Sequence, residues 1–254
     1  RLHTLSIRRG HPINRWQIQA ECGREALEKL AENKIANILE PEVATMRART
    51  RKLLQQVCEV YPCAVISGRS RADVLERVSN ARVKYVVGNH GLEPGRNLAS
   101  FERVVRAVTP KLVRALADHR DVAIEDKKYS LAGHYRKARQ KQKARAAIEA
   151  AVRALAEPMR IIGGKLVVNV VPAGAPHKGD ALAALRSKDG ADTALYVGDD
   201  ITDEDVFELD QPGRLLSIRV GQTRRSAAAY YLRDQAEIDR LLSTLYNLRA
   251  SAKP

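Results

Sequence analysis

Short apolar and polar blocks alternate along the chain, and they predict strands and helices that follow one another closely. Residues 47–60 have apolar positions near helical spacing and predict a helix. Residues 63–66, CAVI, predict a short strand that ends at Ser67-Gly68. Residues 71–78 predict another helix, and residues 85–91, YVVGNHG, a strand that ends in a glycine turn. This rapid alternation favours a parallel, doubly wound sheet.

The pattern changes between about residues 98 and 172, where helices and antiparallel-looking strands predict a separate α/β module. The predicted segments are a helix at 100–119, a strand at 122–136, a long basic helix at 137–157 and strands at 159–171. The strand-helix alternation then resumes, up to a last helix at 236–248. We therefore expect an N-terminal arm (1–20), a core split into residues 21–97 and 173–254, and a cap at 98–172 inserted into that core.

Composition limits the functional classes. The chain has 254 residues, of which 44% are hydrophobic, enough for one large or two small domains with a real core. Its three cysteines, Cys22, Cys58 and Cys63, have no metal-ligand spacing, and we expect a reducing cytoplasm. No apolar run approaches the roughly 18 residues of a membrane span, and the first residues lack the apolar stretch of a signal peptide. We expect a monomer with no membrane partner.

The formal net charge of +14 attracts phosphates, either in a nucleic acid or in a small anionic substrate, although a solvated basic surface explains it equally well. Nucleic acid is the less favoured partner, because no helix-turn-helix signature, aromatic RNA-binding strand or zinc spacing accompanies the charge.

Polar residues gather where the predicted strands end. Ligands of open α/β sheets bind beyond the carboxyl ends of the strands, and residues 67–69, 88–91 and 198–200 all lie there. Asp199 and Asp200 begin a run of five acids within seven residues, directly after a strand. Carboxylate oxygens suit Mg²⁺. The later acids of the run, Glu204 and Asp205, are also explained by the helix dipole.

The segment GDDITDED, together with ISGRS, GNHGLE, HKGDAL and RVGQTRRSAAAYYLRD, closely resembles the trehalose-6-phosphate phosphatases of the haloacid dehalogenase superfamily. The resemblance extends from about Pro41 to Leu245. It implies a Rossmann-like core with an inserted α/β cap, one Mg²⁺, and hydrolysis of trehalose 6-phosphate to trehalose and phosphate.

The resemblance also implies catalytic roles. Ser67 matches the hydroxyl that binds the transferring phosphoryl group, although it also fits a helix N-cap. Lys178 matches the lysine that neutralises phosphate and nucleophile, or it is an exposed lysine at a helix start. Asp199, Asp200 and Asp203 match the motif that holds and tunes the metal, with Asp199 and Asp200 also counted as catalytic.

Substrate contacts are implied for residues of two loops and the cap. These are Arg69, Asn89, His90, Glu93, Lys127, His134 and Arg136. A lone histidine is more often structural, and the basic residues of the cap are equally compatible with solvated positions.

The first motif of the family has no match in this chain. It consists of Asp, any residue, Asp, Gly and Thr at the end of the first strand; its first aspartate attacks phosphorus and its second protonates the leaving oxygen. No aspartate precedes Asp73. We expect that the strand and its aspartates are cut out between EALEKLAENK (25–34) and ILEPEVATM (38–46), with Glu32 as the replacement candidate and weakened Mg²⁺ binding.

Two smaller departures concern the cap, where the family usually has a glutamate at the position of Asn169 and an arginine near Val171.

The sequence leaves three hypotheses for the function. The first is a Mg²⁺-dependent trehalose-6-phosphate phosphatase of impaired activity. The second is a non-catalytic homologue that binds a sugar phosphate or a partner protein. The third and weakest is a binder of nucleic-acid phosphates that uses the basic cap.

Overall fold

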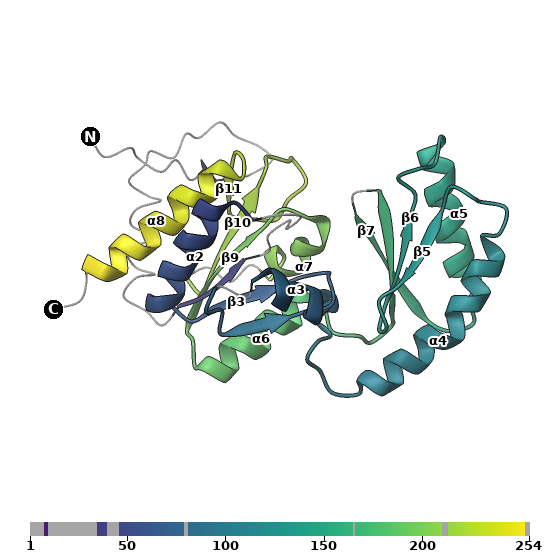
Figure 1. The fold of residues 1–254 in the computed structure, drawn as a ribbon, viewed down its shortest axis with the longest axis horizontal. Coiled ribbons are helices and arrows are strands. Elements are labelled where there is room, and N and C mark those ends of the chain that lie inside the picture. The colour runs from purple at the N-terminus through teal and green to yellow at the C-terminus, as the bar shows by residue number, and fades with distance from the viewer. Residues whose placement is uncertain are drawn as a thin grey trace.

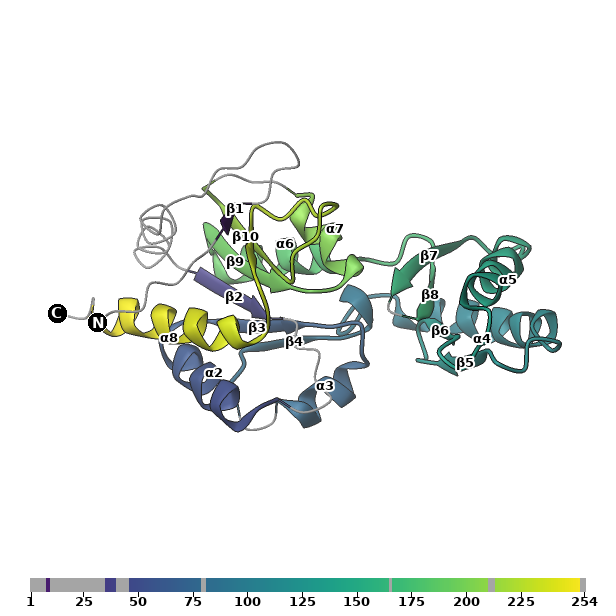
Figure 2. The same cartoon turned by 90° about the horizontal axis from the view of Figure 1, so that it is seen from above.

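A computed structural model describes residues 8–9, 35–39, 46–78, 81–164, 166–209 and 213–251. They form a larger and a smaller unit, each built on its own sheet, with the connecting segments between them (Figures 1 and 2). The predicted α/β class with an inserted second module is confirmed.

The larger unit, called the core here, contains a seven-stranded sheet. In spatial order its strands are β1 (Arg8–Arg9), β11 (Tyr230–Leu232), β10 (Leu215–Val220), β9 (Thr193–Gly198), β2 (Ile35–Leu39), β3 (Cys63–Ile66) and β4 (Tyr85–Val87). All neighbouring pairs run parallel except β1 with β11. The strands that end in polar clusters, β3, β4 and β9, therefore point their carboxyl ends to the same edge of one sheet.

Strand β2 corrects the sequence prediction. Residues 35–39 lie between β3 and β9, with Leu39 opposite both Val65 and Val197. The central strand is therefore present, and the predicted deletion of this strand is wrong. Periodicity does not predict a strand at IANIL, because the segment is short and Asn37 interrupts its apolar run. What the chain lacks is the pair of aspartates, since Glu40, Pro41 and Glu42 follow this strand in the sequence.

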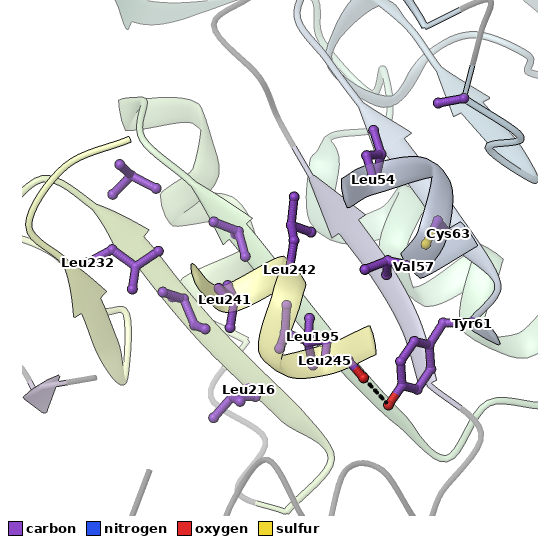
Figure 3. Close-up of a cluster of buried hydrophobic side chains, with 14 residues drawn as sticks. Leu54, Val57, Tyr61, Cys63, Leu195, Leu216, Leu232, Leu241, Leu242 and Leu245 are labelled. Carbon is purple, nitrogen blue, oxygen red and sulfur yellow. Dashed lines mark hydrogen bonds between the residues drawn. The ribbon is translucent and has the colours of Figure 1, made fainter. Parts of the chain in front are cut away.

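Helices cover both faces of the core sheet (Figure 2). They are α2 (Ala48–Val60), α3 (Arg71–Arg77) and α8 (Ala236–Ser251) on one face, and α6 (Lys178–Asp189) and α7 (Glu204–Phe207) on the other. In Figure 3, Leu54 and Val57 of α2 meet Leu242 and Leu245 of α8 over the sheet, and the Tyr61 hydroxyl donates to the Leu245 carbonyl at 3.3 Å.

The smaller unit, called the cap here, is a four-stranded antiparallel sheet with two helices on one face (Figure 1). Its elements are α4 (Leu98–Ala115), β5 (Ala123–Asp126), β6 (Leu131–His134), α5 (Lys141–Arg153), β7 (Met159–Gly164) and β8 (Val167–Pro172). The segment predicted as one strand at 122–136 is a hairpin. Val105 and Leu112 of α4 pack with Ile148 of α5 and Val168 of β8 in a separate apolar cluster.

Other expectations fall outside the described residues. They are the start of the expected core at 21–34, which includes Glu32, and most of the arm at 1–20, of which Arg8 and Arg9 pair with β11. The exact division between core and cap remains a prediction. Within the described ranges, no helix combines the length and the apolar character needed to cross a membrane.

Candidate functional site in the cleft between core and cap

A cavity of about 820 Å³ lies between the strand ends of the core and the open face of the cap sheet. This size suits a small organic ligand. The lining residues are Ser67, Gly68, Arg69, Ser70, Asp73, His90, Glu125, Asp126, Lys127, Lys128, His134, Val167, Asn169, Asp199 and Asp200. Ser67, Arg69, His90, Lys127, His134, Asp199 and Asp200 were predicted from the sequence.

The end of β3 presents Ser67 to the cavity. Its backbone N–H continues the sheet by donating to Val87 O at 2.9 Å. Its hydroxyl oxygen accepts from the Arg69 N–H at 3.2 Å. Among the described residues no acceptor engages the hydroxyl hydrogen, so this hydrogen can donate to a ligand. The N-cap of α3 is Ser70, not Ser67, because Ser70 Oγ accepts from Asp73 N at 3.3 Å. The helix-cap alternative for Ser67 is therefore excluded.

His90 lies in the short helical turn η1 (Asn89–Gly91) after β4 and is 4% exposed. Gly68 must lack a side chain here, because a Cβ would lie 2.5 Å from His90 Cε1. Neither ring nitrogen has a hydrogen-bond partner among the described residues. Burial, followed by the charges of Lys178 and Lys127, lowers the pKa of His90 to about 3, so its ring is neutral near pH 7.

Asn89 and Glu93 do not line the cavity, and their hydrogen bonds hold the loop together. Asn89 is fully buried, and its Nδ2 donates to Glu93 Oε2 at 3.0 Å and to Lys127 O at 3.3 Å. Glu93 Oε2 also accepts from Arg71 N at 2.7 Å. Ser130 Oγ donates to Asn89 Oδ1 at 3.1 Å. These bonds join η1 to α3 and to the cap, and the predicted substrate contacts of Asn89 and Glu93 stay untested.

Lys178 begins α6 and is fully buried, which excludes the exposed-lysine alternative. Its Nζ donates to Asp203 Oδ1 at 3.0 Å, and the Tyr196 hydroxyl donates to the same oxygen at 2.6 Å. Asp203 Oδ2 accepts from Asp200 N at 2.8 Å. Asp203 is also fully buried, and a side chain at Gly198 would collide with its carboxyl group. Asp203 therefore shapes the loop after β9 from inside the core.

Asp199 and Asp200 follow β9 and line the cavity. Arg219 of β10 fixes their backbone, because its guanidinium donates to Asp199 O at 2.9 Å and to Asp200 O at 3.3 Å. Arg219 is in turn paired with Glu204 at 2.8 Å. Neither Arg219 nor the structural role of Glu204 was predicted, since the pairs join residues 15 to 20 positions apart.

The described residues do not make a complete Mg²⁺ site. Asp199 and Asp200 lie together at the cavity, but Asp200 Oδ1 already accepts from Ile201 N at 2.7 Å, and both oxygens of Asp203 are engaged inside the core. In this part of the chain no three His, Cys, Asp or Glu residues are grouped as metal ligands. Because Mg²⁺ requires near-octahedral oxygen coordination, the described carboxylates fall short of it.

Of the basic cap residues predicted as substrate contacts, Lys127 and His134 line the cavity and Arg136 does not. Lys127 is half-buried, and this partial burial lowers the pKa of its ammonium group. Its Nζ donates to Gly68 O at 3.3 Å. His134 lines the cavity and pairs with Glu125 at 2.7 Å. Arg136 is exposed and absent from the cavity lining, so the structure does not bring it to the site. Arg69 lines the cavity, with its guanidinium paired to Asp73 at 3.1 Å.

Comparisons with known proteins show what this chain is similar to. The family model described as trehalose-phosphatase matches residues 33–236. Trehalose 6-phosphate phosphatase RA3 of Zea mays is 28% identical over 250 residues, which cover 85% of this chain and 67% of that protein. A trehalose-phosphate phosphatase of Mycobacterium ulcerans is 32% identical over 219 residues, covering 78% of this chain and 55% of that protein. The matched region thus spans little more than half of that bacterial relative.

Solved structures show the same fold. The C-terminal domain of Candida albicans trehalose-6-phosphate phosphatase has a TM-score of 0.70 at 18% identity, covering 91% of this chain and 98% of that chain. The C-terminal domain of the Candida albicans trehalose synthase regulatory protein has a TM-score of 0.67 at 12% identity, covering 84% and 94%. At these identities the likeness concerns the fold alone.

Proposed function

The chain belongs to the trehalose-phosphatase family, and we propose that its cleft binds trehalose 6-phosphate or a related sugar phosphate while hydrolysing it poorly. The observation that carries this proposal is the meeting of Ser67, Lys127 and the Asp199–Asp200 pair at one cavity between core and cap. A hydroxyl donor and a lysine suit a phosphoryl group.

In this proposal the phosphoryl group binds at the end of β3. Ser67 donates its hydroxyl hydrogen to one phosphoryl oxygen. Lys127 has three donors, and its bond to Gly68 O engages one of them, so the others are available to the same group. Both residues lie on the cavity wall. The sugar then extends toward the cap sheet, past His134 and Asn169, which also line the cavity.

Hydrolysis is expected to be weak because the attacking carboxylate of the family is missing. A covalent route divides a very slow reaction into two easier steps and depends on a well-placed nucleophile. The residue that follows β2 in the sequence is Glu40, whose side chain is one methylene longer than that of aspartate. A misplacement of about 1 Å costs roughly a hundredfold in rate. We propose Glu40, rather than Glu32, as the residue to test, since Glu32 precedes the strand.

The metal part of the proposal is that Mg²⁺ binds weakly, through Asp199 and Asp200. When bound, it would neutralise charge on the phosphoryl oxygens. No step above depends on it, because the described ligands are incomplete.

A non-catalytic, regulatory homologue is the second candidate. The absence of any aspartate before Asp73 favours it, because the phosphoryl-binding residues remain while the family's nucleophile does not. The Candida albicans regulatory protein shares the fold and is so named, which makes a regulatory use of this fold a reasonable alternative.

Two measurements on the whole chain test these proposals. Titration calorimetry with trehalose 6-phosphate should show binding that Ser67→Ala weakens about tenfold, while the exposed control Ser100→Ala leaves it unchanged. Phosphate release with and without Mg²⁺ should stay near background. Absence of binding overturns the proposed function, whereas ordinary turnover overturns the impairment and the regulatory alternative.

A further inference from the structure

We infer that Arg160 of β7, which neither the sequence motifs nor the cavity wall identified, is a specificity-determining residue whose guanidinium binds a pair of sugar hydroxyls in the cleft. This inference rests on the proposed function and adds a residue to it. Where the cap meets the core, several polar side-chain atoms are buried and have no hydrogen-bond partner among the described residues.

The strand register puts Arg160 on the face of the cap sheet that meets the core. Strands β7 and β8 are antiparallel, with Arg160 opposite Val171 and Ile162 opposite Asn169. Directly opposed residues share a face, and so do residues two positions apart in one strand. Asn169 lines the cavity. Arg160 therefore lies on the same face as Asn169, away from α4 and α5.

The guanidinium of Arg160 has two N–H donors that engage none of the described residues. Its Nε and Nη2 atoms are buried and have no hydrogen-bond partner among the described residues. These two N–H groups form one side of the guanidinium fork, which fits two neighbouring oxygen atoms at once. Buried donors are rarely left unpaired, and an unexplained pair of them indicates an absent partner.

The surroundings match a ligand rather than a solvated surface. Strand β7 lies against the turn η2 (Ile201–Asp203), where Thr202 Oγ1 is also buried without a partner among the described residues. The positive charge of Arg160 is close enough to lower the pKa of His90, whose ring nitrogens are likewise unpartnered in this part of the chain. Three residues from β7, η1 and η2 thus present unsatisfied polar atoms near one another.

Hydroxyl groups satisfy this set better than a phosphate does. A neutral imidazole offers one donor and one acceptor, and a hydroxyl can pair with either. The phosphoryl group already has Ser67 and Lys127 at the end of β3. Adjacent hydroxyls of a sugar ring present two oxygens to the guanidinium fork. Arg160 does not line the cavity itself, so its side chain must turn toward the ligand on binding, a rotamer change that is common in filled sites.

The experiment compares ligands that share phosphate but differ in sugar. Titration calorimetry is done with trehalose 6-phosphate, glucose 6-phosphate and inorganic phosphate on the whole chain and on Arg160→Gln, Arg160→Lys and the exposed cap control Arg114→Gln. We expect Arg160→Gln to weaken trehalose 6-phosphate binding at least about tenfold and inorganic phosphate binding not at all. Arg160→Lys should recover little, because lysine has no fork.

The outcomes separate this inference from the proposed function. Equal losses for trehalose 6-phosphate and inorganic phosphate would show that Arg160 binds the phosphoryl group. Unchanged binding of all three ligands would show that it binds neither sugar nor phosphate. Either result overturns the inference. If the unmodified chain binds no sugar phosphate, the proposed function fails first. Thermal unfolding is the structural readout: the midpoint of Arg160→Gln should not fall, since the lost donors have no partners among the described residues. A lowered midpoint with weakened binding of every ligand would assign Arg160 to the fold instead.

Discussion

Asp203 shows that the partners of a carboxylate decide what it can do. Its oxygens accept from Lys178, Tyr196 and the backbone of Asp200 inside the core. These bonds stabilise the charge of the buried Lys178 and set the backbone that presents Asp199 and Asp200. Removing one member of a buried ion pair costs about 3–5 kcal/mol of folding stability. Because Asp203 also accepts from the backbone N–H of Asp200, it serves the site through the loop that it holds. Its predicted role as a metal ligand stays a prediction.

His90 allows a test of its burial through pH. Its pKa is about 3 in the folded protein against 6.5 in a model peptide. Below pH 6.5 the unfolded chain therefore binds a proton that the folded chain refuses until about pH 3. Folding stability is lost as the pH falls through this window, at about 1.4 kcal/mol per pH unit for one proton. Lys178, Lys127 and Arg160 disfavour the charged ring, and Asp203 favours it.

Denaturant unfolding between pH 4 and 7 measures this contribution. His90→Asn should reduce the slope of the unfolding free energy against pH by close to one proton, because asparagine does not titrate and tolerates the left-handed backbone of this position. His119→Gln, at an exposed site, is the matched control for removing an imidazole. An identical slope in His90→Asn and the unmodified chain would mean that His90 titrates normally.

At the scale of elements, the position of β2 decides where a missing nucleophile should be restored. The strand ends at Leu39, and Glu40-Pro41-Glu42-Val43-Ala44 follows with its acids spaced as the aspartates of the family motif are. We predict that Glu40→Asp with Glu42→Asp, Val43→Gly and Ala44→Thr raises phosphate release from trehalose 6-phosphate at least about a hundredfold, because it returns the shorter side chain to the motif position.

The matched comparison is insertion of Asp-Phe-Asp-Gly-Thr between Lys34 and Ile38. That insertion falls within β2, and an odd number of added residues turns the rest of the strand to the opposite face. It should therefore give an unfolded or aggregated protein, which circular dichroism would report. An active insertion variant, or an inactive but folded substitution variant that binds the substrate, would contradict the assignment of β2 as the strand of the first motif.

Periodicity and strand ends determined what the sequence could predict. Long segments such as α4, α5 and α8 carry enough apolar positions to be recognised, and the parallel topology brings residues 67, 90 and 199 to one cleft. Short or interrupted elements are harder to predict: IANIL is a short strand between two others with an asparagine in it, and the hairpin of β5 and β6 is predicted as one strand. Long-range partners, such as Arg219 with the Asp199 carbonyl, have no spacing rule.

At the scale of the whole molecule, the cleft depends on how the cap meets the core. Lys127 and Ser130 of the cap reach Gly68 and Asn89 of the core, at 3.3 and 3.1 Å. Next to them Leu92 of the core packs with Tyr129 and Val171 of the cap. Interfaces of this kind between domains permit relative motion unless they are large and apolar. The polar contacts around Asn89 are therefore expected to control how often the cleft opens.

Ser130→Ala tests that control, because it removes the hydroxyl that donates to Asn89 Oδ1 and leaves a buried acceptor without this bond. The loss of one such bond is worth about 1 kcal/mol, or about a fivefold change in an opening equilibrium. Hydrogen exchange should accelerate by that factor in η1 and in the turn between β5 and β6. It should not change in α5, whose contacts lie within the cap. Ser100→Ala, which removes an exposed bond to Asn97 O at the start of α4, is the control. Faster exchange throughout the cap would mean that Ser130 stabilises the cap itself, and unchanged exchange at η1 would mean that the apolar contacts alone hold the two units together.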